Sequence, residues 1–234
     1  MTALDDLLDE IFDGKQPALY AEFEGWVRAS RRFKAFATSY RGKIRTKLKT
    51  ARDDASMKDL GAELEAAALL LREDRFTALE YEKYIALKQR GPDFTVTYKT
   101  HTPFNVEVRR IRSGEWDESD VEARIVKLMA VLCDKVGQMP PSIVNLLWLT
   151  TDREMTEDDL TRAMVTLRQL AEGKVEAFFT RRGFANAADF LKQYRLMSGI
   201  VLRPAGETVL WLNSLARHKA PPEIMTAIQK LEKA

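Results

Sequence analysis

The sequence predicts an α/β fold, and three kinds of segment support that prediction. Residues 93–111 read as two short strands joined by a turn, because apolar and polar side chains alternate with the period of two typical of a strand. Residues 142–150 are apolar nearly throughout, which is typical of a strand buried on both faces. Residues 58–73 and 118–136 instead carry apolar side chains at steps of three and four, which predicts amphipathic helices.

The predicted hairpin carries carboxylates at two unusual places. Its strands alternate from Asp93 to Lys99 and from Phe104 to Ile111, and a Thr-His-Thr-Pro turn joins them, with the proline expected to stop further pairing. Asp93 opens the first strand directly after Gly-Pro, and Glu107 lies between two valines that we expect to be buried. A carboxylate in a strand core is costly unless a charge or a metal ion compensates it, so the two acids mark a candidate site.

The stretch GPDF, followed one hairpin later by EVR, resembles the PD-(D/E)xK nuclease superfamily, the restriction-endonuclease-like proteins. The resemblance implies that Asp93, Glu107 and the main-chain carbonyl of Val108 hold a divalent cation, Mg²⁺ or Mn²⁺, for phosphodiester hydrolysis of DNA or RNA. Arg109 stands where the family has its catalytic lysine. Arginine stays protonated and cannot act as a general base, although it can neutralise charge on a scissile phosphate. Arg109 therefore leaves two readings open, a tolerated variant or an inactive site.

A further carboxylate, Glu63, lies on the apolar side of the predicted helix 58–73. The resemblance implies that a glutamate on the helix before the core sheet reaches the metal site as part of the catalytic set, and Glu63 is at the matching place. The alternative is that Glu63 pairs with a cation at the border of the apolar stripe. Glu80 and Glu82, on a strand predicted within residues 75–87, are expected to be solvated, although one could approach the acids of the hairpin.

The predicted order of elements in residues 58–150 is helix, three strands, helix, strand. This is the core order of the PD-(D/E)xK fold, so the resemblance implies a restriction-endonuclease-like core around a mixed sheet; spacing alone gives only a mixed α/β sheet. Further elements are predicted after this core: helices at 156–171 and 186–194, a hairpin at 196–202 and 208–212 that extends or caps the sheet, and a last helix after Pro221-Pro222.

Residues 1–55 are predicted to form a basic helical arm, and residues 56–234 the PD-(D/E)xK-like domain with a C-terminal extension. Helices are expected at 4–12 and from Pro17, and residues 26–48 carry a helical apolar stripe. No acid occurs between Glu24 and Asp53, so this stretch is the strongest charge asymmetry in the chain. The alternatives are a solvated face that pairs with acidic segments elsewhere, or a surface that contacts a nucleic-acid backbone through Arg31, Arg32, Lys34, Arg41, Lys43, Arg45 and Lys47.

The composition describes an ordinary globular chain. Its 234 residues, 45% hydrophobic and with a net charge of +2, are enough to bury a core. The single cysteine, Cys133, excludes an internal disulfide and is expected to be a packed thiol. His101 and His218 have no partner at metal-ligand spacing. Neither a signal peptide nor an apolar run long enough to span a bilayer is visible, so a cytoplasmic location without membrane attachment is expected.

Two functions remain open from the sequence. The first is a metal-dependent nuclease in which Asp93, Glu107 and Glu63 serve the cation and Arg109 holds the phosphate. The second is a catalytically inactive protein with the nuclease fold, acting as a module that binds nucleic acid or protein. In the inactive case we expect Arg109 to form a salt bridge with Glu107 or Asp93 and so to occupy the metal position.

Overall fold

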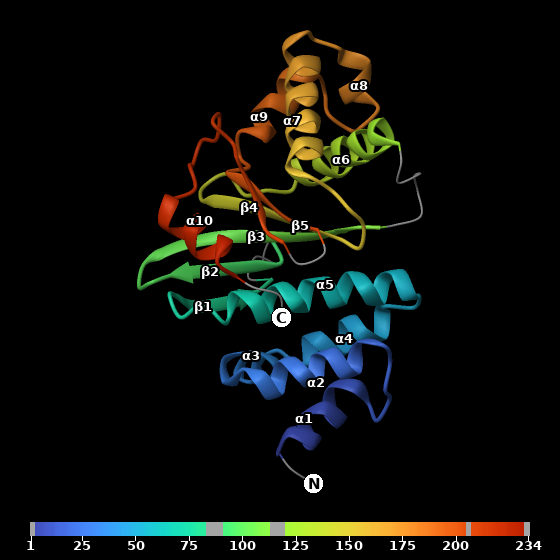
Figure 1. The fold of residues 1–234 in the computed structure, drawn as a ribbon, viewed down its shortest axis with the longest axis vertical. Helices are drawn as coiled ribbons and strands as arrows, with labels where there is room; N and C mark the ends of the chain where they lie inside the picture. The colour runs from blue at the N-terminus through green and yellow to red at the C-terminus, as the bar shows by residue number, and fades with distance from the viewer. Residues whose placement is uncertain (1–2, 83–90, 113–119, 205–206, 232–234) are drawn as a thin grey trace.

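The computed structural model describes residues 3–82, 91–112, 120–204 and 207–231 of the chain. Their central feature is a six-stranded mixed sheet with helices on both faces (Figure 1). The predicted α/β class is therefore confirmed. The strands, in order along the sheet, are β1 (Phe76–Tyr81), β2 (Phe94–Tyr98), β3 (Thr102–Ile111), β4 (Val144–Thr151), β5 (Gly199–Pro204) and β6 (Val209–Leu212).

The directions of the strands combine two hairpins with a parallel centre. The pairs β1–β2, β2–β3 and β5–β6 are antiparallel, whereas β3–β4 and β4–β5 are parallel. The predicted C-terminal hairpin therefore extends the sheet. The predicted order of helix, three strands, helix and strand is also observed, whereas the specific likeness to restriction endonucleases stays a prediction.

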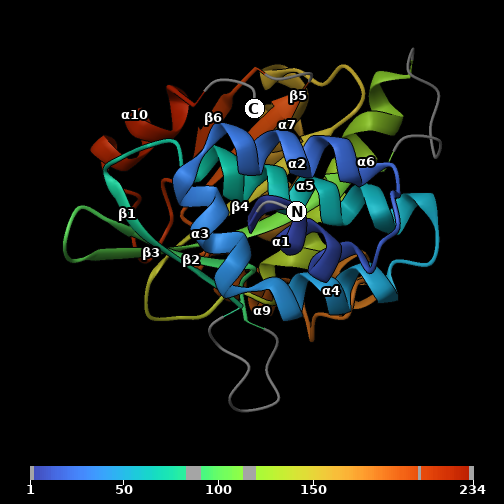
Figure 2. The same ribbon diagram turned by 90° about the horizontal axis from the view of Figure 1, so that it is seen from below.

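The helices form layers on either side of the sheet. Helix α5 lies along one face, the N-terminal helices lie beyond α5, and a second group of helices covers the opposite face (Figures 1 and 2). The N-terminal group is α1 (Ala3–Phe12), α2 (Leu19–Ala29), α3 (Arg31–Ser39) and α4 (Arg41–Thr50), followed by α5 (Asp54–Leu70). The group on the opposite face is α6 (Val121–Val136), α7 (Glu157–Glu172), α8 (Glu176–Thr180) and α9 (Ala187–Tyr194), whereas α10 (Pro222–Gln229) packs into the core on the α5 side.

Alternation along the strands divides the buried apolar residues into two cores. Val106 and Trp148 belong to the core on the α5 side, which also contains apolar residues of α1 to α4 and of α10. Leu147 and Leu149 belong to the core between the sheet and helices α6, α7 and α9. The predicted boundary at residue 55 falls in the first turn of α5, so the N-terminal arm packs directly onto the helix that covers the sheet.

The apolar stripe at residues 26–48 is carried by three helices rather than by one. Ser30 has an extended backbone (φ −134°, ψ 116°) that ends α2, and its hydroxyl accepts a 3.1 Å hydrogen bond from the Phe33 N–H at the start of α3. Tyr40 separates α3 from α4 with φ −111° and ψ 15°. Both breaks preserve the spacing of the apolar residues, which is why periodicity did not reveal them.

The hairpin differs from the prediction at its turn. Pro103 lies inside β3, opposite Thr97, and Thr102 pairs with Tyr98, so the proline does not stop the pairing. The chain reverses at Lys99 instead, which has the left-handed φ of 53° that is typical of turns.

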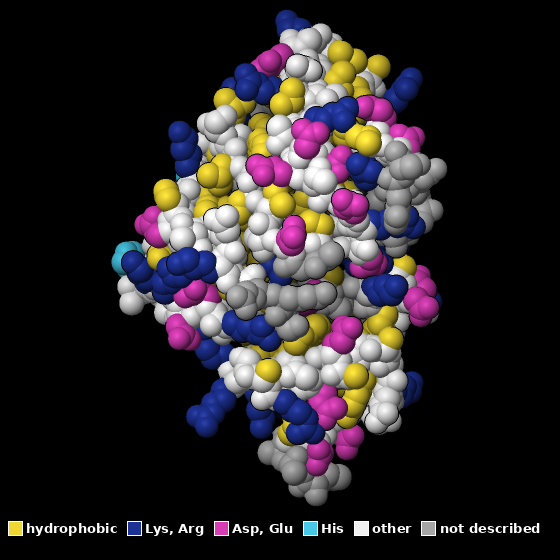
Figure 3. All heavy atoms as spheres, viewed as in Figure 1, with side chains coloured by type: hydrophobic (Ala, Val, Ile, Leu, Met, Phe, Trp, Pro, Cys, Tyr) yellow, Lys and Arg dark blue, Asp and Glu magenta, His cyan; other side chains and the backbone are white. Residues whose placement is uncertain are grey.

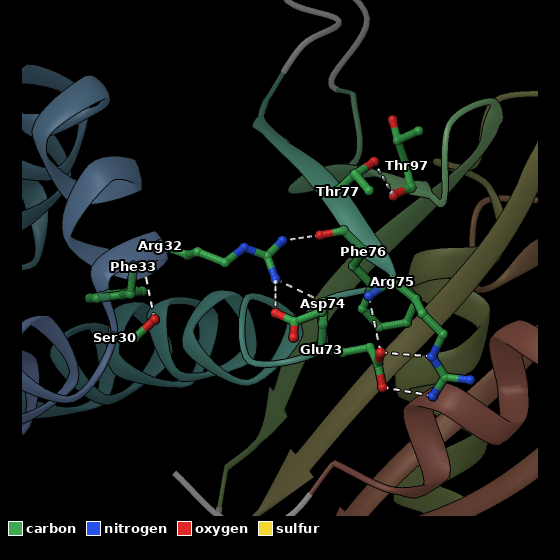
Figure 4. A network of polar contacts seen from close by, with 9 residues as sticks. All are labelled: Ser30, Arg32, Phe33, Glu73, Asp74, Arg75, Phe76, Thr77 and Thr97. Carbon is green, nitrogen blue, oxygen red and sulfur yellow. Dashed lines mark hydrogen bonds and ion pairs between the residues drawn. The ribbon is translucent and has the colours of Figure 1, made fainter.

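A single arginine ties α3 to the start of β1. The Arg32 guanidinium donates to the main-chain carbonyls of Glu73, at 2.9 Å, and Phe76, and lies 3.7 Å from the Asp74 carboxylate (Figure 4). Glu73 is in turn engaged by the Arg75 side chain at 2.7 Å. These contacts fix the N-terminal helices against the edge strand of the sheet.

Candidate metal centre

A cavity of about 320 Å³ lies where α4, α5, β2, β3 and α6 meet. It brings together all four residues predicted to form the catalytic set, although they come from three separate elements. Two lysines that were not part of that set join them. The residues used below that line the cavity are Glu63, Asp93, Glu107, Arg109, Lys47 and Lys135.

Asp93 is held in place by the neighbouring strand. Because Phe94 pairs with Val106, the start of β2 lies beside the middle of β3, and Asp93 Oδ2 accepts a 2.7 Å hydrogen bond from the Val108 N–H. Burial of the carboxyl group, and then the negative charges of Glu63 and Glu107, raise the pKa of Asp93 well above its ordinary value, while the Val108 N–H acts in the opposite direction. Asp93 is therefore a carboxylate that needs a compensating cation.

Glu107 already has a compensating cation, which comes from α6 on the face of the sheet opposite α5. The Lys135 ammonium of α6 lies 2.5 Å from Glu107 Oε1, and both side chains are less than one-tenth exposed. Sequence reasoning missed Lys135. A signal was present, because Lys135 follows Leu128 and Leu132 by seven and three residues and so continues the apolar stripe of the helix.

Among the described residues, the three carboxylates that lie close enough together to share a cation are Glu63, Glu82 and Asp93. Each offers one oxygen, and these oxygens all lie within 4.8 Å of one another. Glu82 follows β1 directly, has a left-handed φ of 49°, and donates its main-chain N–H to the Asp93 carbonyl at 2.8 Å. Glu82 is therefore the acid of this strand that approaches the hairpin, which the sequence had left open as an alternative.

Lys47 of α4 contacts two members of this trio. Its ammonium lies 2.5 Å from Glu63 Oε1 and 2.6 Å from Glu82 Oε1. Burial by itself would lower the pKa of Lys47, but the charges and hydrogen bonds of the two glutamates outweigh it and raise the pKa. Glu63 thus pairs with a cation, as the alternative from the sequence proposed, and it does so within the same cavity.

Tyr81 lies against the same group of charges. Its side chain is buried, and its hydroxyl has no hydrogen-bond partner within the described parts of the chain. Burial raises the pKa of Tyr81, and the charge and hydrogen-bonding capacity of Glu63, followed by the charges of Glu82 and Asp93, act in the same direction. The Lys47 ammonium is 4.7 Å from the centre of the tyrosine ring.

Arg109 does not form the salt bridge expected of an inactive site. It lines the cavity half-buried, and it makes no hydrogen bond or ion pair with any other residue in the ranges that the structure describes. Lys135 holds Glu107 instead. The guanidinium of Arg109 is therefore available for an anion that enters the cavity.

Five of the seven basic residues predicted to contact nucleic acid are engaged within the protein. They are Arg32, described above, Arg41 with Glu10, Arg45 with Asp13, Lys43 with the Tyr81 carbonyl and Glu82, and Lys47 with Glu63 and Glu82. Acidic and basic side chains are also interspersed on the face shown in Figure 3. Arg31 and Lys34 have no ion pair within the described ranges, so these two remain the candidates on the arm for contact with a phosphate backbone.

The donor set suits a hard divalent cation. Carboxylate oxygens are the ligands that Mg²⁺ and Mn²⁺ prefer, and three converge here, with further acidic and basic side chains in the lining of the cavity. The Val108 carbonyl stays a predicted ligand; the contact that the structure gives is from its N–H to Asp93. The sequence also predicts a loop at residues 88–91, whose two cations would either lie beside the site or be ordinary exposed charges; residues 88–90 lie outside the described ranges.

The remaining candidate residues, Cys133, His101 and His218, are held by ordinary packing and polar contacts. Cys133 is a free, buried thiol on α6, and burial raises its pKa to about 12, as expected of a packed cysteine. His101 contacts the Thr100 hydroxyl at 2.8 Å, and His218 contacts the Pro141 carbonyl at 3.1 Å. In the described parts of the chain, no helix has the length and apolar character required to cross a bilayer.

Comparison of the chain with models of protein families, with curated proteins and with solved structures found no match.

Proposed function

We propose that the protein is a divalent-metal-dependent phosphodiesterase that cleaves nucleic acid at this cavity. The observation that carries the proposal is the convergence of Glu63, Asp93 and Glu107, from a helix and two strands, on one cavity that also holds Arg109 and Lys135. Carboxylates that are buried or half-buried together are costly without cations, and two cationic side chains beside them suit an anionic substrate.

A Mg²⁺ or Mn²⁺ ion bound by the carboxylates would neutralise phosphate charge and lower the pKa of a water molecule. Arg109 can hold a phosphate oxygen, because its guanidinium is always charged and presents paired donors. Lys135 brings an ammonium group, a compact charge with three donors, to the same cavity. In this proposal Lys135 takes the place of the family lysine, orienting the attacking water while it neutralises Glu107.

One observation favours the second candidate, an inactive module that binds nucleic acid or protein. Lys47 already neutralises Glu63 and Glu82, and Lys135 already neutralises Glu107, so the charges of the cavity are partly balanced without an ion. Such a protein would bind without cleaving. Cleavage assays separate the two candidates directly.

The test is hydrolysis of labelled single-stranded and double-stranded DNA and RNA with Mg²⁺, with Mn²⁺ and with a chelator. Asp93→Asn removes the anchored carboxylate with little change of shape, and we expect cleavage to fall at least about a hundredfold, as for the loss of one group that stabilises charge in a transition state. The matched control is Glu172→Gln, which alters an exposed carboxylate paired with Arg168 on α7. Absence of cleavage with every substrate and metal, or cleavage that Asp93→Asn leaves intact, would contradict the proposal.

A further inference from the structure

We infer that Glu63, Glu82 and Asp93 are the carboxylates that bind the divalent cation, and that Lys47 of the N-terminal arm competes with the ion for them. This inference adds detail to the proposed function, and it relies on that proposal for what the site is used for. It differs from the ligand set implied by the sequence resemblance, because it adds Glu82 and leaves Glu107 with Lys135.

The geometry separates the two groups of acids. The trio places three oxygens within 4.8 Å of one another, a spacing that a single ion with oxygen contacts of about 2.0–2.6 Å can bridge. Glu107 instead has a lysine at 2.5 Å on the α6 side of the sheet, with both side chains buried. Withdrawing Glu107 from that pair would leave a buried ammonium uncompensated, which is strongly unfavourable.

A second observation points to a ligand at the trio. The Tyr81 hydroxyl is buried, it makes no hydrogen bond of normal geometry within the described residues, and Glu63 is the carboxylate that affects it most. Buried polar groups are nearly always satisfied by protein, water or a bound group. An ion with its water molecules, placed between the three carboxylates, would provide that partner.

Lys47 stands where such an ion would sit. Its Nζ contacts Glu63 at 2.5 Å and Glu82 at 2.6 Å, so a single ammonium bridges two of the three carboxylates. Lys43, one turn earlier on α4, donates to the Tyr81 carbonyl at 2.7 Å and lies 3.4 Å from Glu82. Binding of a divalent cation would therefore have to release Lys47, and the contacts of α4 with the end of β1 would change with it.

The competition has a functional consequence. The chain partly balances the charge of its acid cluster with its own lysine until an ion arrives. Release of Lys47 then leaves an unpaired positive charge in the lining of the cavity, where a phosphate can take the place of the glutamates. Ion binding and the position of the N-terminal arm are thereby linked, since each state of the trio admits only one of the two cations.

The experiment measures binding of Mn²⁺ by calorimetry in the full chain, without any substrate. Lys47→Met keeps the length of the side chain over Tyr81 and removes the charge, so we expect Mn²⁺ to bind at least about tenfold more tightly than in the wild type. In the Lys47→Met background, Glu82→Gln should reverse that gain. Lys49→Met is the matched control, because Lys49 is exposed on the same helix and lies only near Asp13, at 3.8 Å; its affinity should equal that of the wild type.

Two results would overturn the inference. One is an unchanged or weaker affinity in Lys47→Met, and the other is a gain that Glu82→Gln does not reverse. If Lys47→Met does not fold, a titration of the wild type with Mg²⁺ followed by backbone amide resonances decides the matter, because the signals of residues 43–51 must move. Tight Mn²⁺ binding without any cleavage would support this inference while contradicting the proposed function.

Discussion

At the scale of single residues, the centre of this protein is a set of buried charges that the fold pairs across elements. Glu107 on β3 and Lys135 on α6 form the most buried of these pairs. A buried pair adds little net stability, because desolvation of the two ions offsets their attraction. Removing one partner is different, since it leaves a buried charge without compensation.

A double-mutant cycle on this pair tests that argument. We expect Lys135→Met to lower the free energy of unfolding by about 3–5 kcal/mol, because it leaves Glu107 uncompensated. The double variant Glu107→Gln/Lys135→Met should lose less, since no buried charge remains. Urea unfolding followed by circular dichroism measures both, and a double variant less stable than Lys135→Met would contradict the pairing.

Residue chemistry could be predicted only in part from the sequence. Asp93 and Glu107 were recognisable because a carboxylate in an apolar alternating strand is unusual. Lys135 carried the same kind of signal in a helical stripe, but its partner lies 28 residues away, and only the packing of α6 on the sheet brings the two together. Glu82 gave no signal, because its approach to Asp93 depends on a local left-handed turn at the end of β1.

At the scale of secondary-structure elements, a row of polar side chains crosses the sheet inside the protein. The Thr95 hydroxyl donates to Asn105 Oδ1, and Asn105 Nδ2 donates to Asn145 Oδ1, both at 2.9 Å. Asn145 Nδ2 also reaches three main-chain carbonyls, of Pro140, Ile143 and Leu196. The row links β2, β3 and β4 to the segments that precede β4 and β5.

The row predicts an order of stabilities. Asn105→Ala leaves the Thr95 hydroxyl and Asn145 Oδ1 without partners, and we expect a loss of about 1–3 kcal/mol in the free energy of unfolding. Asn145→Ala should cost more, because three part-buried main-chain carbonyls lose the amide donor that they share. Thermal and urea unfolding of the two variants give the comparison, and an Asn145→Ala variant as stable as the wild type would show that water replaces the side chain.

The elements themselves were largely visible from periodicity, since the strands of the hairpin, the apolar β4 and the amphipathic α6 all follow their expected patterns. The breaks within residues 26–48 were not visible, because Ser30 and Tyr40 interrupt the backbone without disturbing the apolar spacing. The place of Pro103 inside β3 was also missed. The short helix α8 has too few residues for a period to show.

At the scale of the whole molecule, the N-terminal arm belongs to the same core as the sheet. Phe23, Phe33 and Phe36 of the arm pack in one cluster with Leu64 of α5 and Val106 of β3. The three phenylalanines are almost fully buried, so the arm covers apolar surface that would otherwise face water.

Removal of residues 1–53 should therefore abolish cooperative folding. The truncated chain would expose the outer face of α5, and we expect loss of the near-ultraviolet circular dichroism signal together with binding of a hydrophobic dye. A shorter truncation that removes only α1 should retain a cooperative but less stable fold. A chain lacking residues 1–53 that unfolds at the midpoint of the wild type would show that the domain stands without its arm.

The same core also contains Ile224 and Ile228 of α10, close to the other end of the described chain. During synthesis at about 5–20 residues per second, α1 leaves the ribosome roughly 10–45 s before α10 does. The phenylalanine-rich helices next to α1 therefore spend that time without their packing partners in α10. Folding of this core can therefore be completed only after α10 has left the ribosome.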